Sequence, residues 1–162
     1  MTLRPATPAD FAFIRALAQR PDYALFITDE DEDALARYLT GSSSLLIWQD
    51  ADGPAGFALF CELGDPSGRV ELRRLALARA GRGEGAAFVR VLVDHAFTTL
   101  NAQRLWLDAS GENPRAHKVY DRAGFTLEGR LRGHWYRPAS ARVVDLLLYG
   151  MMRDEWAALP PA

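Results

Sequence analysis

The order of predicted elements between residues 69 and 109 constrains the fold more than any other feature. A predicted strand, Arg69–Ala78, leads into the glycine-rich stretch ARAGRGEGAAF at residues 78–88. A predicted helix, Ala86–Leu100, and a second predicted strand, Arg104–Ala109, follow. Because a helical crossover returns the chain in the direction in which it left, two neighbouring strands joined this way run parallel. The sequence therefore predicts one parallel crossover in the middle of the chain.

The flanking segments predict hairpins and three further helices. Helix starts are indicated at Thr7-Pro8, after the acidic run Asp29–Asp33, and at Asn113-Pro114, where a capping residue or proline opens the first turn. The hairpin strands are expected at Leu45–Gln49 with Ala55–Glu62 and at about Thr126–Tyr136 with Arg142–Met152. This order predicts an α/β (α+β) fold with a mixed sheet, in a single domain over residues 1–162.

The apolar face of the first crossover strand changes side halfway along. Val70 and Leu72 occupy even-numbered positions, whereas Leu75 and Leu77 occupy odd-numbered ones. One extra residue at positions 73–74 would return all four side chains to one face. The pattern therefore predicts a β-bulge, a feature that often re-aims a strand beside a functional site.

Composition narrows the class of protein. The 162 residues are 49% hydrophobic and 25% charged, as in an ordinary soluble domain, and the net charge of −2 favours no polyanionic partner. Cys61 is the one cysteine, so an internal disulfide or a cysteine-rich metal site is excluded. The first residues lack signal-peptide features, and no apolar run is long enough to span a bilayer. We expect a cytoplasmic protein with no metal and no nucleic-acid or membrane partner.

The glycine-rich loop precedes a helix, where unpaired backbone N–H groups and the helix dipole bind anions. An ordinary turn that needs positive φ is the alternative. A nucleoside triphosphate site would need Lys-Ser or Lys-Thr after the glycines, and neither is present. Gly81, Gly83 and Ala86 fit the dinucleotide pattern G-x-G-x-x-A, with Asp108 near the end of the next strand. However, too little chain follows for the second half of a doubly wound sheet.

A third anion is the pyrophosphate of coenzyme A, and here two blocks of sequence resemble a known family. VELRRLALA, GRGEGA and the long helix are followed by RLWLDA and ENPRAHKVYDRAGF. Together they resemble the Gcn5-related N-acetyltransferase (GNAT) superfamily over roughly Leu45 to Met152, close to the branch of ribosomal-protein N-terminal and small-amine acetyltransferases. The family's loop pattern, Arg or Gln-x-x-Gly-x-Gly or Ala, falls on residues 80–85, with Ala80 in the first position and Gly83 and Gly85 as its glycines. In the second block, the family's pattern is matched by Asn113, Tyr120 and Gly124-Phe125.

The resemblance implies how acetyl-CoA would bind. The sheet of this fold splays between its fourth and fifth strands, and the gap admits the cofactor arm. The backbone of Leu75, Ala76 and Leu77 would pair with the pantetheine amides and supply an N–H for the oxyanion. The side chain of Asn113 would contact the same arm, or else cap its helix. The pyrophosphate would lie on the amides of the helix start, namely Arg82, Gly83, Glu84, Gly85 and Ala86.

The resemblance also implies two catalytic residues. Tyr120 would protonate the departing thiolate, although it also belongs to an apolar helix stripe typical of a core position. Glu71 would help to deprotonate the amine, or else would be a carboxylate paired with a neighbouring arginine. The implied function is direct acetyl transfer from acetyl-CoA to a primary amine, either of a peptide N-terminus or of a small molecule. The alternatives are a non-catalytic CoA-binding module and a nicotinamide-dependent oxidoreductase, and the oligomeric state is open between monomer and homodimer.

Overall fold

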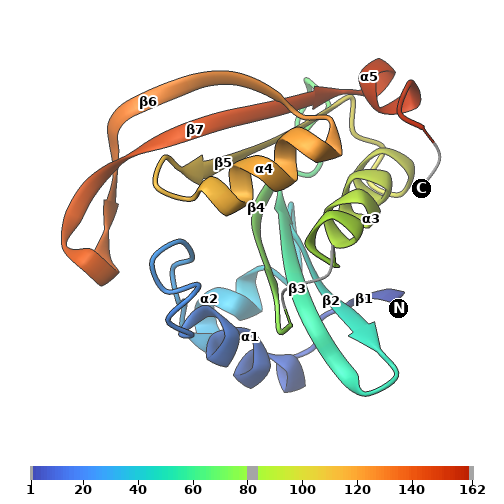
Figure 1. Cartoon of the computed structure of the whole chain (residues 1–162). Helices are drawn as coiled ribbons and strands as arrows, with labels where there is room; N and C mark the ends of the chain where they lie inside the picture. The colour runs from blue at the N-terminus through green and yellow to red at the C-terminus, as the bar shows by residue number, and fades with distance from the viewer. Residues whose placement is uncertain (1, 80–83, 161–162) are drawn as a thin grey trace.

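A computed structural model describes residues 2–79 and 84–160, and its centre is a seven-stranded sheet in the order β1-β2-β3-β4-β5-β7-β6 (Figure 1). The strands pair antiparallel except β4 with β5, which are parallel, as the central crossover predicts. The strands are β1 (Thr2–Pro5), β2 (Ser44–Asp50), β3 (Gly53–Cys61), β4 (Arg69–Leu77), β5 (Arg104–Ser110), β6 (Thr126–Arg137) and β7 (Arg142–Met152).

Helices cover both faces of the sheet and enclose two apolar cores. On one face α1 and α2 pack against β2 and β3, and on the other α3 and α4 pack against β4, β5 and β7. Short 3-10 turns precede α1 and join β6 to β7. The bounds are η1 (Pro8–Asp10), α1 (Phe11–Ala18), α2 (Glu32–Arg37), α3 (Glu84–Thr98), α4 (Pro114–Ala123), η2 (Pro138–Ser140) and α5 (Arg153–Ala157).

The parallel pair β4–β5 separates soon after it begins. Its register joins Arg69 to Arg104, Val70 to Leu105 and Glu71 to Trp106 and continues no further. Beyond these pairs β4 runs on with β1–β3, while β5 follows β7 and β6 in another direction (Figure 1). The sheet is thus split between its fourth and fifth strands, as the family resemblance implied.

The predicted bulge in β4 is confirmed. Phe60 of β3 faces Leu72, whereas the preceding residue, Leu59, faces Arg74, so Arg73 is the extra residue. The extra residue keeps Leu72 and Leu77, of opposite parity, in the same core with α3. The bulge therefore lies where β4 begins to leave β5.

One helix boundary and one short helix differ from the sequence-based expectation. The helix predicted from Ala86 already includes Glu84 as its first described residue, and a carboxylate is favourable in the first turn because of the helix dipole. The short helix α5 was not predicted, since five residues are too few for a recognisable apolar period. It follows β7 directly, and Glu155 accepts a hydrogen bond from the backbone N–H of Met152 at 2.7 Å.

Candidate active site

A pocket of about 470 Å³ occupies the split between β4 and β5. Its volume is in the range of ligand sites, and its wall combines aromatic and aliphatic side chains with a few charged groups. The wall is formed by the segment between α1 and α2, by β4, by the first turn of α3, by the end of β5, by α4, and by one residue each of β6 and β7. Its members include Tyr23, Phe26, Ile27, Glu71, Arg73, Leu75, Leu77, Gly85, Asp108, Asn113, Tyr120 and Trp135.

The free edge of β4 forms one side of this pocket. The N–H of Ala78 donates to Ala55 of β3 at 2.8 Å, and backbone groups alternate in direction along a strand. The peptide groups of Leu75 and Leu77 therefore point away from β3, towards the split. Ala76, the third residue that the resemblance assigns to the cofactor, buries its side chain in the opposite core, beside α1.

The start of α3 borders the pocket as well. Gly85 lines it, next to Glu84 and Ala86 in the first turn of α3, where backbone N–H groups have no partner within the helix. An added Cβ at Gly85 would meet only Val119, at 3.9 Å. The other two loop residues assigned to the pyrophosphate, Arg82 and Gly83, lie outside the described residues.

Asn113 caps α4 and also lines the pocket. Its Oδ1 accepts a hydrogen bond from the N–H of Ala116 at 3.1 Å, which caps α4, and its side chain also lines the pocket. An asparagine amide has two N–H donors besides its oxygen. Within the described ranges these donors have no partner, so the cap leaves them available to a ligand.

Tyr120 is both a core residue and a pocket residue. Its side chain is 7% exposed and packs against the rings of Phe125 and Tyr149, with centroids 5.9 and 5.5 Å away. It nevertheless lines the pocket. Burial raises its pKa, and the negative charge of Asp108 raises it further. The hydroxyl therefore keeps its proton throughout the neutral range.

Glu71 is buried and held in an ion pair. The guanidinium of Arg73, the bulge residue, donates two hydrogen bonds to Oε2 of Glu71, from Nε at 2.8 Å and from Nη2 at 2.6 Å. This is the arginine-paired arrangement that the sequence left open. Both hydrogen bonds reach Oε2, and within the described ranges Oε1 has no hydrogen-bond partner.

Asp108 is a pocket residue that sequence reasoning did not assign to this site. It lies on β5, two residues beyond Trp106, the last residue paired with β4. It is an exposed residue that lines the pocket. Desolvation in this enclosed position raises its pKa, and the charge of Glu71 adds to the shift. Side chains alternate along a strand, so Asp108 faces away from the core side chains of Leu107 and Ala109. This alternation is the sequence signal that could have assigned Asp108 to the pocket.

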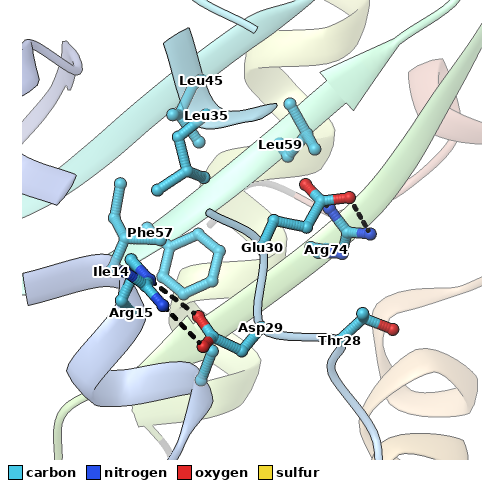
Figure 2. A pocket seen from close by; sticks show the side chains of 11 residues that line it. Ile14, Arg15, Thr28, Asp29, Glu30, Leu35, Leu45, Phe57, Leu59 and Arg74 are labelled. Atoms are coloured by element: carbon cyan, nitrogen blue, oxygen red, sulfur yellow. Dashed lines mark hydrogen bonds and ion pairs between the residues drawn. The ribbon is translucent and has the colours of Figure 1, made fainter. Parts of the chain in front are cut away.

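A second cavity is too small to be a ligand site. It lies between α1, α2 and β3, with a volume of about 10 Å³, roughly the space of one water molecule. Ion pairs close its rim, where Arg15 binds Asp29 and Arg74 binds Glu30, the latter with Nη1 and Oε2 2.7 Å apart (Figure 2). These contacts tie the segment before α2 to α1 through Asp29 and to β4 through Glu30.

The described residues form neither a metal-binding cluster nor a membrane-spanning helix. Residues 2–79 and 84–160 contain no group of three or more His, Cys, Asp or Glu side chains arranged to hold a metal ion. Within the same ranges, no helix has the length and apolar character needed to cross a membrane.

Comparisons with known proteins identify a family and several relatives of this chain. The profile of a family described as "Acetyltransferase (GNAT) domain" matches residues 1–126. An N-acetyltransferase called p20 from Bacillus licheniformis is 28% identical over 113 residues, which cover 69% of this chain and 62% of that protein. Spermidine N(1)-acetyltransferase from Escherichia coli K12 is 23% identical over 143 residues, covering 83% of this chain and 77% of that protein.

Solved structures show the same fold. Spermidine N-acetyltransferase from Vibrio cholerae, in complex with CoA and spermine, superposes with a TM-score of 0.85 at 22% identity, covering 96% of this chain and 97% of that chain. A dodecameric structure of the Vibrio cholerae enzyme gives a TM-score of 0.80 at 21% identity and covers 97% and 96%. The chain belongs to the GNAT acetyltransferase family, so the family and fold predicted from the sequence are confirmed.

Proposed function

We propose that this protein transfers the acetyl group of acetyl-CoA directly to a primary amine. The observation that carries the proposal is the pocket in the split sheet, which brings the free edge of β4, the start of α3, Asn113 and Tyr120 together. These elements come from the two sequence blocks that resemble the family. A nicotinamide-dependent oxidoreductase fits poorly, because β4–β5 is a single parallel pair in an otherwise antiparallel sheet.

The cofactor would extend along β4 towards the N-terminus of α3. The peptide groups of Leu75 and Leu77 would pair with the pantetheine amides, and an N–H of this edge would hold the oxyanion of the tetrahedral intermediate. The free amide donors of Asn113 would contact the same arm. The N–H groups of Glu84, Gly85 and Ala86 would bind the pyrophosphate, which is favoured at a helix N-terminus.

The position of Gly85 supports a different register for the loop pattern. With Ala80 first, the pattern lacks its arginine. Two residues further on it fits completely, with Arg82 first, Gly85 as the glycine and Ala87 last. We therefore propose that Arg82 is the loop residue whose side chain contacts the cofactor and that Gly83 is a spacer. An Arg82→Ala variant should then bind CoA more weakly than an Arg79→Ala variant.

Tyr120 is the proposed acid for the departing thiolate. It lines the pocket, its hydroxyl is protonated at neutral pH, and the apolar packing of its ring fixes its direction. The ion pair between Glu71 and Arg73 also supports a structural role, in which Glu71 holds the bulge residue in place and balances its positive charge. Glu71 stays the proposed residue that helps to deprotonate the amine.

Acceptor and partners remain proposals. Two relatives bear the name of spermidine acetyltransferases, so polyamines belong in the first acceptor panel. We further propose a cytoplasmic monomer or homodimer that acts without nucleic acid or membrane, in line with the net charge of −2. Light scattering after size-exclusion chromatography tests the oligomeric state.

The decisive experiment has two readouts. CoA and acetyl-CoA should raise the melting temperature by mass action, whereas NAD and ATP should have little effect. Release of CoA from acetyl-CoA should then be screened with amines and N-terminal peptides. Stabilisation by CoA without turnover of any acceptor would indicate a binding module, and stabilisation by NAD alone would refute the assignment.

A further inference from the structure

The short connection between β5 and α4 is tied to the end of the β6–β7 hairpin. Residues 111–113 form this connection, and its middle residue, Glu112, accepts hydrogen bonds from two arginines. Nη2 of Arg137 donates to Oε2 of Glu112 at 2.8 Å, and Nη2 of Arg142 donates to Oε1 at 2.8 Å. Arg137 ends β6 and pairs with Arg142, which begins β7. Glu112 therefore joins the connection to both strands of the hairpin.

Arg137 is the buried member of this cluster. It is 3% exposed, and its Nε donates to the hydroxyl of Ser140 at 2.7 Å. A guanidinium so far from water needs a negative partner, because a buried charge loses its hydration. Among residues 2–79 and 84–160, Glu112 is the one carboxylate that forms an ion pair with it. The ion pair of Glu112 with the exposed Arg142 is of the weaker surface kind.

Backbone hydrogen bonds hold the other sides of the connection. The N–H of Gly111 donates to the carbonyl of Asp145 on β7 at 2.8 Å, and the N–H of Asn113 donates to the carbonyl of Ser110 at 2.9 Å. The N–H of Glu112 donates to Oγ of Ser110 at 3.3 Å. These contacts bind the connection to β5 and β7, and the Glu112 carboxylate adds the tie to the end of β6.

Glu112 lies beside the pocket, whereas its neighbours line it. Ser110, Asn113 and Pro114 are wall residues, and between them the Glu112 side chain turns to Arg137 and Arg142. The cap at Ala116 fixes the side-chain oxygen of Asn113 relative to α4. The tie at Glu112 fixes the backbone from which the Asn113 side chain starts. The direction of the Asn113 amide donors depends on both.

We propose that Glu112 is a positioning residue for the cofactor, whose ion pair with Arg137 holds Asn113 where its amide donors reach the pantetheine arm. This inference rests on the proposed binding of acetyl-CoA. Glu112 itself makes no contact with the cofactor, because its charge would repel the phosphates of CoA if it faced them. Hydrogen bonding from Arg137 and the charge of Arg142 lower the pKa of Glu112, so the ion pair persists throughout the neutral range.

A double-mutant cycle on CoA affinity tests this assignment. The Kd of CoA is measured by titration calorimetry for the full chain with Glu112→Gln, with Asn113→Ser and with both changes. Serine keeps a capping oxygen and removes the amide donors, so Asn113→Ser should raise the Kd by about three- to tenfold. Glu112→Gln should raise it by a similar or smaller factor. The double variant should bind CoA as Asn113→Ser does, since both changes remove the same contact.

Affinity separates positioning from a merely structural role. Glu112→Gln should also lower the melting temperature, because Arg137 loses its charged partner. The control, Glu128→Gln, breaks the ion pair with Arg104 away from the pocket, at a side chain 35% exposed against 44% for Glu112. It should lower the melting temperature and leave the Kd unchanged. If Glu112→Gln does not fold, Glu112→Asp, which keeps the charge and shortens its reach, replaces it in the cycle.

The possible outcomes are distinct. An unchanged Kd in the Glu112 variant, or effects of the two changes that multiply in the double variant, would overturn the inference. A wild-type chain that binds no CoA would instead refute the proposed function.

Discussion

The hydroxyl of Tyr23 occupies both backbone groups of Leu77 at the free edge of β4. It accepts a hydrogen bond from the N–H of Leu77 at 2.9 Å and donates one to the carbonyl of the same residue at 3.1 Å. The neighbouring Arg20 donates to the carbonyl of Ala78. The segment after α1 therefore already supplies hydrogen-bond partners to the part of the β4 edge that the pantetheine arm is proposed to use. Tyr23 and the cofactor would compete for the peptide groups of Leu77.

Replacing Tyr23 by phenylalanine should therefore tighten cofactor binding. The ring keeps its packing while the competing hydroxyl is lost, and each net hydrogen bond is worth about 0.5–1.5 kcal/mol. The Kd of CoA should fall by up to about tenfold, and the unliganded protein should lose about 1 kcal/mol of stability. Titration calorimetry and urea unfolding measure the two effects.

The matched control for this experiment is Tyr38→Phe. It removes a hydroxyl from the same side of the sheet, one that donates to Glu30 at 3.2 Å rather than to the β4 edge. This variant should leave the Kd of CoA unchanged. Unchanged or weaker CoA binding in Tyr23→Phe would mean that the cofactor does not need the Leu77 peptide groups.

Gly85→Ala tests whether the start of α3 binds phosphate. The added methyl group would contact only Val119 at 3.9 Å, and alanine favours a helix over glycine by about 1 kcal/mol, so stability should hold or rise. A phosphate approaching the backbone would meet the methyl group, so the Kd of CoA should increase several-fold. Gly129→Ala on β6, with open space around the added Cβ, is the control. Unchanged affinity in Gly85→Ala would favour an ordinary turn.

Local sequence patterns predicted the parts of the fold that depend on near neighbours. The parity change between Leu72 and Leu75 located the bulge, because alternation along a strand depends on chain position alone. Asn113 and Gly124 marked the two ends of α4 for the same reason. Gly124 has φ of 94°, which favours glycine, and Asn113 supplies the cap.

The contacts that occupy the site were not predictable in this way. Tyr23 and Leu77 are 54 positions apart and meet because the segment after α1 folds over the sheet edge, a segment with no apolar period of its own. The raised pKa of Asp108 likewise depends on enclosure by several distant elements and on the charge of Glu71. Parity shows which face of the sheet a side chain takes but not what surrounds it there.

The ion pair between the partly exposed Arg4 and the buried Asp10 should make stability depend on acid pH. The guanidinium of Arg4 donates to Asp10 at 2.7 Å, and with the N–H of Thr7 it lowers the carboxyl pKa to about 2. The folded pKa lies below the unfolded value of about 3.9, so the contribution is complete above that value and disappears as pH falls towards 2. Asp10→Asn should cost about 1–2 kcal/mol at pH 7 and about half as much at pH 3, by urea unfolding. An equal loss at both pH values would contradict the ion-pair origin.

Tyr120→Phe separates the acid from the core residue. Phenylalanine retains the ring contacts with Phe125 and Tyr149 and removes only the proton source. On an accepted amine, kcat should fall by about 10²–10⁴-fold, while the Kd of acetyl-CoA and the stability change little. Tyr149→Phe is the matched control, since this ring lies in the same aromatic cluster and is 2% exposed.

Because burial raises the pKa of Tyr120, wild-type kcat should show no alkaline fall from this group below the ordinary tyrosine range. Stopped assays of CoA release across pH measure both quantities, and normal turnover in Tyr120→Phe would leave water as the proton donor.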